Sequence, residues 1–150
     1  MISKKTKYAL KAVLMLTSKY ASKEPVLIAD IAREESIPKK FLELILLELK
    51  NKGFLRSKKG KGGGYLLAKP PNQLTFGDVI SIFENTFASF PCLAVKLQHR
   101  CDECCNGNSC GIQMVMKEVQ TATSNILNVT TFQEIYDRMR NTHQESMYFI

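Results

Sequence analysis

All five cysteines of this 150-residue chain lie within one short segment, and their chemistry and spacing could support a metal or redox site. They are Cys92, Cys101, Cys104, Cys105 and Cys110. Cysteines that serve only as core residues would be expected at apolar positions of several elements. Their confinement therefore indicates a thiolate site on a loop. Such a site could hold an iron–sulfur cluster or a zinc ion, or undergo thiol oxidation.

Zinc and direct thiol oxidation remain alternatives to a cluster. Cys101 and Cys104 are separated by two residues, which is typical of one half of a zinc site, and two of Cys92, Cys105 and Cys110 could complete the four ligands. Lys96 and Arg100 could favour the thiolate form of neighbouring cysteines and so promote oxidation. His99 is a further candidate ligand.

The other polar residues do not predict an enzyme. Of the two histidines, His143 is expected in a terminal tail, so that only His99 could pair with a cysteine nucleophile. The carboxylate pairs 34–35 and 102–103 are neighbours in sequence, and adjacent side chains point in different directions. Catalysis is therefore not expected.

Positive charge is concentrated in the first half of the chain. Residues 1–72 contain 16 Lys or Arg and 6 Asp or Glu, whereas residues 73–150 contain 5 and 8, which agrees with the net charge of +7. A basic half of this kind predicts a polyanionic partner, with nucleic acid as the first candidate.

The start of the chain, Met1-Ile-Ser-Lys-Lys-Thr-Lys, shows no targeting signal, and no long apolar run predicts a membrane span. We therefore expect a cytoplasmic protein with no membrane partner. An odd number of cysteines in a reducing compartment favours metal or redox chemistry over a disulfide framework.

The periodicity of apolar residues predicts six helices and one β-hairpin. The helices are expected near residues 3–20, 28–36, 38–52, 75–87, 112–127 and 131–139, and the two strands near 54–57 and 65–68. The side chains expected to be buried are Ala9, Ala12, Val13, Leu16 and Tyr20 in the first helix, Leu42, Ile45, Leu46 and Leu49 in the third, and Phe76, Val79, Ile80 and Phe83 in the fourth, which Thr75 would cap. We expect a DNA-binding domain over 1–72, and a second part over 73–140 that contains a cysteine-rich sensor loop (88–111). Residues 141–150 are expected to form a loose tail.

The order of these elements predicts a mainly α protein with a small β-hairpin wing, in other words a winged helix-turn-helix domain followed by a long helix. The helix over 38–52 would enter the major groove, with Lys39 and Lys40 near phosphates or bases. Glu43 would accept a hydrogen bond from a cytosine amino group and so contribute specificity. The expected wing contacts with the DNA backbone come from Lys58, Lys59, Lys61, Gly62 and Gly63.

Several motifs of the chain resemble those of one family of bacterial transcriptional regulators. They are Tyr8-Ala-Leu, Pro25-Val-Leu-Ile-Ala-Asp-Ile-Ala, Ile37-Pro-Lys-Lys-Phe-Leu-Glu, Gly53-Phe-Leu-Arg-Ser-Lys-Lys-Gly-Lys-Gly-Gly-Gly-Tyr and Val129-Thr-Thr-Phe. Together with the cysteine-rich loop, they are similar to the Rrf-two family, which includes the cluster regulator IscR, the nitric-oxide-sensitive NsrR and the cysteine-metabolism repressor CymR. The resemblance extends to about Tyr136.

The resemblance implies a homodimer that binds a palindromic operator on double-stranded DNA, with repression as the expected action. In the cluster-bearing branch, an iron–sulfur cluster (2Fe–2S or 4Fe–4S) controls DNA affinity. By position its ligands here would be Cys92, Cys104 and Cys110, with Cys101 and Cys105 as rivals for the middle place. Gln113 stands where some members have a histidine ligand, which leaves the fourth ligand open. Relatives without a cluster sense through a protein partner, which is the alternative.

The long helix over 112–127 carries an apolar stripe at helical spacing. Its members are Ile112, Val115, Met116, Val119, Ala122 and Ile126. The resemblance implies that this helix crosses its counterpart in the dimer, so that the stripe would form the dimer interface.

Overall fold

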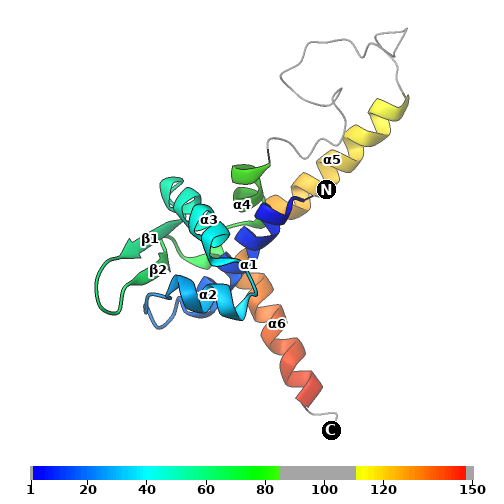
Figure 1. Ribbon diagram of the computed structural model, residues 1–150. Coiled ribbons are helices and arrows are strands. Elements are labelled where there is room, and N and C mark those ends of the chain that lie inside the picture. Colours follow the sequence, from blue (N-terminus) through cyan, green and yellow to red (C-terminus); the bar gives the residue numbers. More distant parts are fainter. Residues whose placement is uncertain (1, 85–110, 148–150) are drawn as a thin grey trace.

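The computed structural model describes residues 2–84 and 111–147 (Figure 1). The elements are α1 (Lys4–Ser18), α2 (Ile28–Glu34), α3 (Lys39–Asn51), β1 (Leu55–Lys58), β2 (Gly64–Leu67), a 3-10 turn η1 (Pro71–Gln73), α4 (Phe76–Phe83), α5 (Gly111–Val129) and α6 (Phe132–Met147). The fold is mainly helical with a two-stranded antiparallel hairpin, as expected.

Helix α1 is the central element of the core, because it packs against α3, α4, α6 and β2. The Ser3 hydroxyl caps its first turn by accepting a hydrogen bond from the Thr6 amide. Its buried face includes Ala9, Ala12 and Val13. Tyr20 was expected on this face, but the helix ends at Ser18 and the Tyr20 side chain is 37% exposed.

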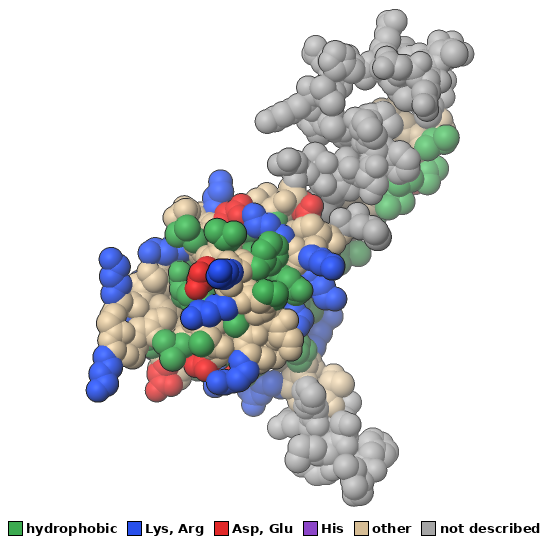
Figure 2. Space-filling model, in the orientation of Figure 1, with side chains coloured by type: hydrophobic (Ala, Val, Ile, Leu, Met, Phe, Trp, Pro, Cys, Tyr) green, Lys and Arg blue, Asp and Glu red, His purple; other side chains and the backbone are tan. Residues whose placement is uncertain are grey.

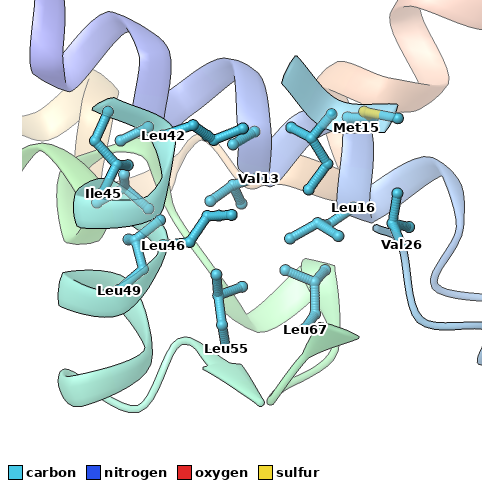
Figure 3. Packing of buried hydrophobic residues seen from close by; sticks show 14 of the residues in the cluster. Val13, Met15, Leu16, Val26, Leu42, Ile45, Leu46, Leu49, Leu55 and Leu67 are labelled. Carbon is cyan, nitrogen blue, oxygen red and sulfur yellow. The ribbon is translucent and has the colours of Figure 1, made fainter. Parts of the chain in front are cut away.

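One cluster of apolar side chains joins α1, α3 and the hairpin. As Figure 3 shows, Leu16 from α1, Leu46 from α3 and Leu67 from β2 point toward one another. The α3 positions that the sequence predicted as buried, Leu42, Ile45, Leu46 and Leu49, are all fully buried. The orientation of α3 is therefore fixed by packing along one whole stripe of the helix.

The two strands of the hairpin pair with each other, and β2 also pairs with the segment that precedes α2. Leu55 pairs with Leu67, and Lys58 pairs with Gly64 at the tip. In addition, Val26 and Tyr65 exchange two backbone hydrogen bonds of 2.9 Å. A Cβ at Gly64 would lie 2.4 Å from the Val26 carbonyl oxygen, so this close approach requires glycine.

Helix α4 begins with the capping residue that the sequence predicted. The Thr75 hydroxyl accepts from the Asp78 amide, and the Asp78 carboxylate accepts from the Thr75 amide. The helix ends at Phe83 rather than near residue 87, because Glu84 adopts an extended backbone conformation. Of the four side chains expected to point inward, Val79 and Ile80 are buried, whereas Phe76 and Phe83 are only half-buried.

Backbone hydrogen bonds join the start of α4 to the start of α6. The Phe76 amide donates to Thr130, and the Phe132 amide donates to Leu74, both at 3.0 Å. The Phe76 and Phe132 rings stack with centroids 4.4 Å apart, and Phe132 is fully buried. We call this arrangement of residues 74–76 and 130–132 the clasp.

The terminal helix is longer than the sequence indicated. Helix α6 continues to Met147, so the expectation of a helix ending near 139 and a loose tail from 141 was wrong over residues 141–147. The sequence beyond Met139 contains no proline or glycine, and local pairs such as Arg138 with Glu134 support the helix. In Figure 1, α5 and α6 project from the globular part in different directions.

In the part of the chain that the structure describes, no helix is both long and apolar enough to cross a membrane.

Candidate nucleic-acid interface

On the side opposite its buried stripe, helix α3 exposes both charged and apolar side chains. Lys39, Lys40 and Glu43 are all exposed, as the sequence predicted. Leu44 and Leu47 lie on the same outer side, and their side chains are 61% and 49% exposed. These two leucines were not among the residues predicted for the interface, although both fall outside the buried stripe. The exposed surface of α3 is therefore only partly charged.

The turn before α3 is tight and has an unusual residue in its sharpest position. Ser36 has φ 54°, in the left-handed region that glycine usually occupies. The Ile37 amide donates to the Ala32 carbonyl at 2.9 Å, and Ile37 is buried. This turn sets the angle between α2 and α3, so it positions the first residues of α3.

The tip of the hairpin combines exposed lysines with glycines that the loop itself requires. Lys58, Lys59 and Lys61 are exposed, and Figure 2 shows Lys and Arg side chains projecting at this edge of the molecule. Gly62 has φ 75°, and a Cβ at Gly63 would lie 2.4 Å from the Lys58 carbonyl oxygen. These two glycines therefore shape the loop, whatever else they contact.

Helix α5 leaves its apolar stripe uncovered. None of the residues 111–129 is buried in the single chain, and the Val119 side chain at the middle of the helix is 50% exposed. Ile112, Val115 and Ile126 are also exposed, and Met116 is half-exposed. Figure 2 shows apolar side chains along this projecting helix. An exposed apolar stripe of this length is typical of a surface that another molecule covers.

A polar network links the N-terminus of α1 to the end of α4. The Glu84 carboxylate accepts hydrogen bonds from the Ser3 amide, at 2.9 Å, and from the Thr6 hydroxyl. The bond from Thr6, followed by those from Ser3, holds the pKa of the Glu84 carboxyl below its ordinary value of 4.5. Thr6 is fully buried, which makes this pair the interior part of the network.

Lys5 connects the same region to α3. Its ammonium group forms an ion pair with Glu48 of α3 and lies 4.9 Å from the centroid of the Phe83 ring. Lys5 is thus in contact with both α3 and the end of α4, next to Glu84. This link was not predicted from the sequence, because its members are far apart in the chain.

Replacing Glu84 with glutamine should make the protein less stable at neutral pH, by about 1 kcal/mol, because a charged acceptor is lost from these hydrogen bonds. Folding lowers the pKa of Glu84 below 4.5. The stability that the Glu84 carboxylate contributes is therefore fully present above pH 4.5, and it is lost as the pH falls through the lower pKa of the folded state. The difference in melting temperature between wild type and Glu84→Gln should therefore shrink on acidification. Glu34→Gln, at an exposed position of α2, is the control and should show little difference at any pH.

The predicted metal ligands lie outside the described residues. This applies to all five cysteines and to His99, because residues 85–110 are not described. Within 2–84 and 111–147, no group of three or more His, Cys, Asp or Glu side chains is arranged to hold a metal ion.

A helix-turn-helix unit with an attached basic hairpin defines a winged helix-turn-helix protein of the DNA-binding class. The sequence matches the Rrf2 family, described as an iron-dependent transcriptional regulator, over residues 2–138. The chain therefore belongs to the Rrf2 family, and it is a DNA-binding transcriptional regulator.

Individual relatives agree with this assignment. The chain is 37% identical over 121 residues to an rrf2-like HTH-type transcriptional regulator of Rhodobacter capsulatus, covering 79% of this chain and 81% of that one. It is 32% identical to the HTH-type transcriptional regulator NsrR of Bacillus licheniformis over 130 residues, or 87% of each chain. These relatives are named as regulators, not as enzymes.

Solved structures support the fold. The structure of CymR, described as the global cysteine regulator of B. subtilis, superposes with a TM-score of 0.76 at 24% identity, covering 92% of this chain and 97% of that one. T. potens IscR gives a TM-score of 0.73 at 22% identity, with coverages of 93% and 88%. The expected winged helix-turn-helix fold is thereby confirmed.

Proposed function

We propose that the chain is a homodimeric repressor whose affinity for a palindromic operator is controlled by an iron–sulfur cluster, either 2Fe–2S or 4Fe–4S. Cys92, Cys104 and Cys110 would hold the cluster. The observation that carries the proposal is the confinement of all five cysteines to residues 92–110, in a member of a family described as iron-dependent. Thiolates are the usual ligands of such clusters, so this donor set fits the group. When bound, the cluster would supply the sensitivity to iron or oxidants.

The operator contacts are proposed for α3 and the hairpin tip. Lys39 and Lys40 at the exposed start of α3 would approach phosphates and base edges, and Glu43 would accept from a cytosine amino group. Lys58, Lys59 and Lys61 would neutralise phosphates, and Gly62 and Gly63 would let the loop backbone come close to them.

A route from the sensor segment to α3 supports the control step. Glu84 precedes Cys92 by eight residues in the sequence and is bound to Ser3 and Thr6 of the α1 N-terminus. Lys5, in the same turn of α1, is paired with Glu48 of α3. A change in residues 85–110 that displaced Glu84 would therefore act on the α1 turn that contacts α3. This is the kind of contiguous packed connection through which two sites can be coupled.

Replacing Lys59 and Lys61 together with alanine should weaken binding to every DNA sequence to a similar degree. The slope of log affinity against log salt should fall by about 0.9 for each phosphate that is no longer neutralised. The measurement is a salt titration of binding to operator and to random duplexes. Lys117→Ala, an exposed lysine of α5, is the matched control. Equal slopes for wild type and the double variant would exclude the hairpin tip from the interface.

The function as a whole is tested by purifying the chain anaerobically and measuring visible absorption, iron, sulfide and zinc. We expect charge-transfer bands with iron and sulfide in similar amounts, and a change in operator affinity when iron is chelated. A colourless protein with one zinc per chain would instead make the cysteines a structural site. A protein with neither metal, whose DNA affinity responds to oxidants, would indicate direct thiol sensing.

A further inference from the structure

The outer stripe of α3 has an apolar centre. Positions 40, 43, 44 and 47 recur at spacings of three and four residues, so their side chains lie side by side on the helix surface. They are opposite the stripe of 42, 45, 46 and 49, which is fully buried. Leu44 and Leu47 are therefore exposed because of the rotation of α3 that the core imposes. They form an apolar strip beside Glu43.

The surroundings of this strip are basic. Lys39 and Lys40 are exposed at the N-terminal end of α3, and Lys50 is exposed near its C-terminal end. On the face that carries α3, Figure 2 shows apolar side chains interspersed with Lys and Arg and with fewer Asp and Glu. A partner that covers the two leucines must therefore offer apolar groups framed by negative charge. The major groove of thymine-containing DNA does so, since each thymine presents a C5-methyl group between the phosphate backbones.

We infer that Leu44 and Leu47 read thymine methyl groups in the major groove, next to the base that Glu43 contacts. This inference rests on the proposed placement of α3 in the major groove. The two leucines then act as specificity residues: they favour thymine over cytosine by apolar contact, and Glu43 selects cytosine at a neighbouring position. Each half-site should accordingly contain thymine beside cytosine at the positions that α3 covers.

The test removes single methyl groups from the DNA. An operator is first selected from random duplexes with the full-length, anaerobically purified protein. Each thymine of one half-site is then replaced in turn by uracil, which lacks only the C5-methyl group. Burial of one methyl group predicts that affinity falls about four-fold at one or two adjacent positions and is unchanged elsewhere. Because this measurement uses the wild-type chain, it does not depend on the folding of a variant.

The same duplexes are then measured with Leu44→Ala. The substituted side chain is largely exposed, so the variant should fold. We expect it to bind the thymine and uracil operators equally at the position that Leu44 reads. Met139→Ala, which shortens an exposed apolar side chain on α6, should retain the wild-type preference.

Two results would overturn the inference. Sequence-specific binding that ignores uracil at every position would show that the leucines do not read thymine, and would leave the regulator function standing. An apolar strip that serves a protein partner would give this result. An absence of sequence-specific binding to any duplex would remove both the inference and the proposed function on which it rests.

Discussion

Replacing Val119 with glutamate should convert the proposed dimer to a monomer and reduce its operator affinity by about 10² to 10⁴-fold. The Val119 side chain lies at the middle of the exposed stripe of α5, where a carboxylate facing its symmetry mate would be buried unpaired or repelled. A monomer contacts only one half-site at a time, so it loses the gain in effective concentration that the second half-site provides.

Sedimentation and operator titration measure the two parts of this effect. Thr121→Glu is the matched control, because it adds the same charge to the same helix at an exposed position outside the stripe. It should remain a dimer with operator affinity close to that of wild type. If Val119→Glu were still dimeric, the stripe of α5 would not be the dimer interface, and another surface would have to bring the two chains together.

Replacing Cys92, Cys104 or Cys110 with serine should abolish the response of DNA binding to iron. In the wild type, chelation of iron should change operator affinity by about 5 to 150-fold, the usual range for coupled sites. In each of these variants the affinity with and without chelator should be the same, and the visible absorption should be lost, because a serine hydroxyl is a poor ligand for a cluster.

Cys101→Ser and Cys105→Ser are the internal controls for this prediction. They remove a thiol from the same segment but should retain both the absorption and the response. If Cys101→Ser lost the cluster and Cys104→Ser retained it, Cys101 rather than Cys104 would be the middle ligand. If the wild type contained zinc and the ligand variants lost it, the cysteines would form the alternative zinc site and not a cluster site.

The sequence predicted those parts of the fold that follow from local patterns. The buried stripe of α3 was correct in all four members because a helix repeats every 3.6 residues, and Leu42 to Leu49 follow that period. Thr75 was correct as a cap because a hydroxyl at that position can accept from the first turn of the helix. The hairpin followed from a basic, glycine-rich loop between two short apolar runs.

Other features could not be predicted, because no local pattern determines them. Tyr20 continued the apolar period of α1, but the chain had already left the helix. The residues after Met139 lack an apolar period, and α6 nevertheless continues. The hydrogen bond between Thr6 and Glu84 joins residues 78 positions apart in the sequence. Ser36 adopts a left-handed backbone conformation although it is neither glycine nor asparagine, the residues that usually indicate one.

The clasp anchors the C-terminal end of α5, so a change in the tilt of α5 at that end would move its N-terminal end. Near its C-terminal end, α5 packs closely against α4, since a Cβ on Gly77 of α4 would overlap the Asn128 side chain of α5. The residues of the clasp begin at Thr130, directly after the end of α5. Its other end, at Gly111, adjoins the cysteine segment in the sequence. A helix of 19 residues is about 28 Å long, so a tilt of about 5° at this fulcrum would displace the far end by about 2.5 Å. A small change of angle beside Gly77 would thus become a larger displacement at Gly111, which follows Cys110 in the sequence.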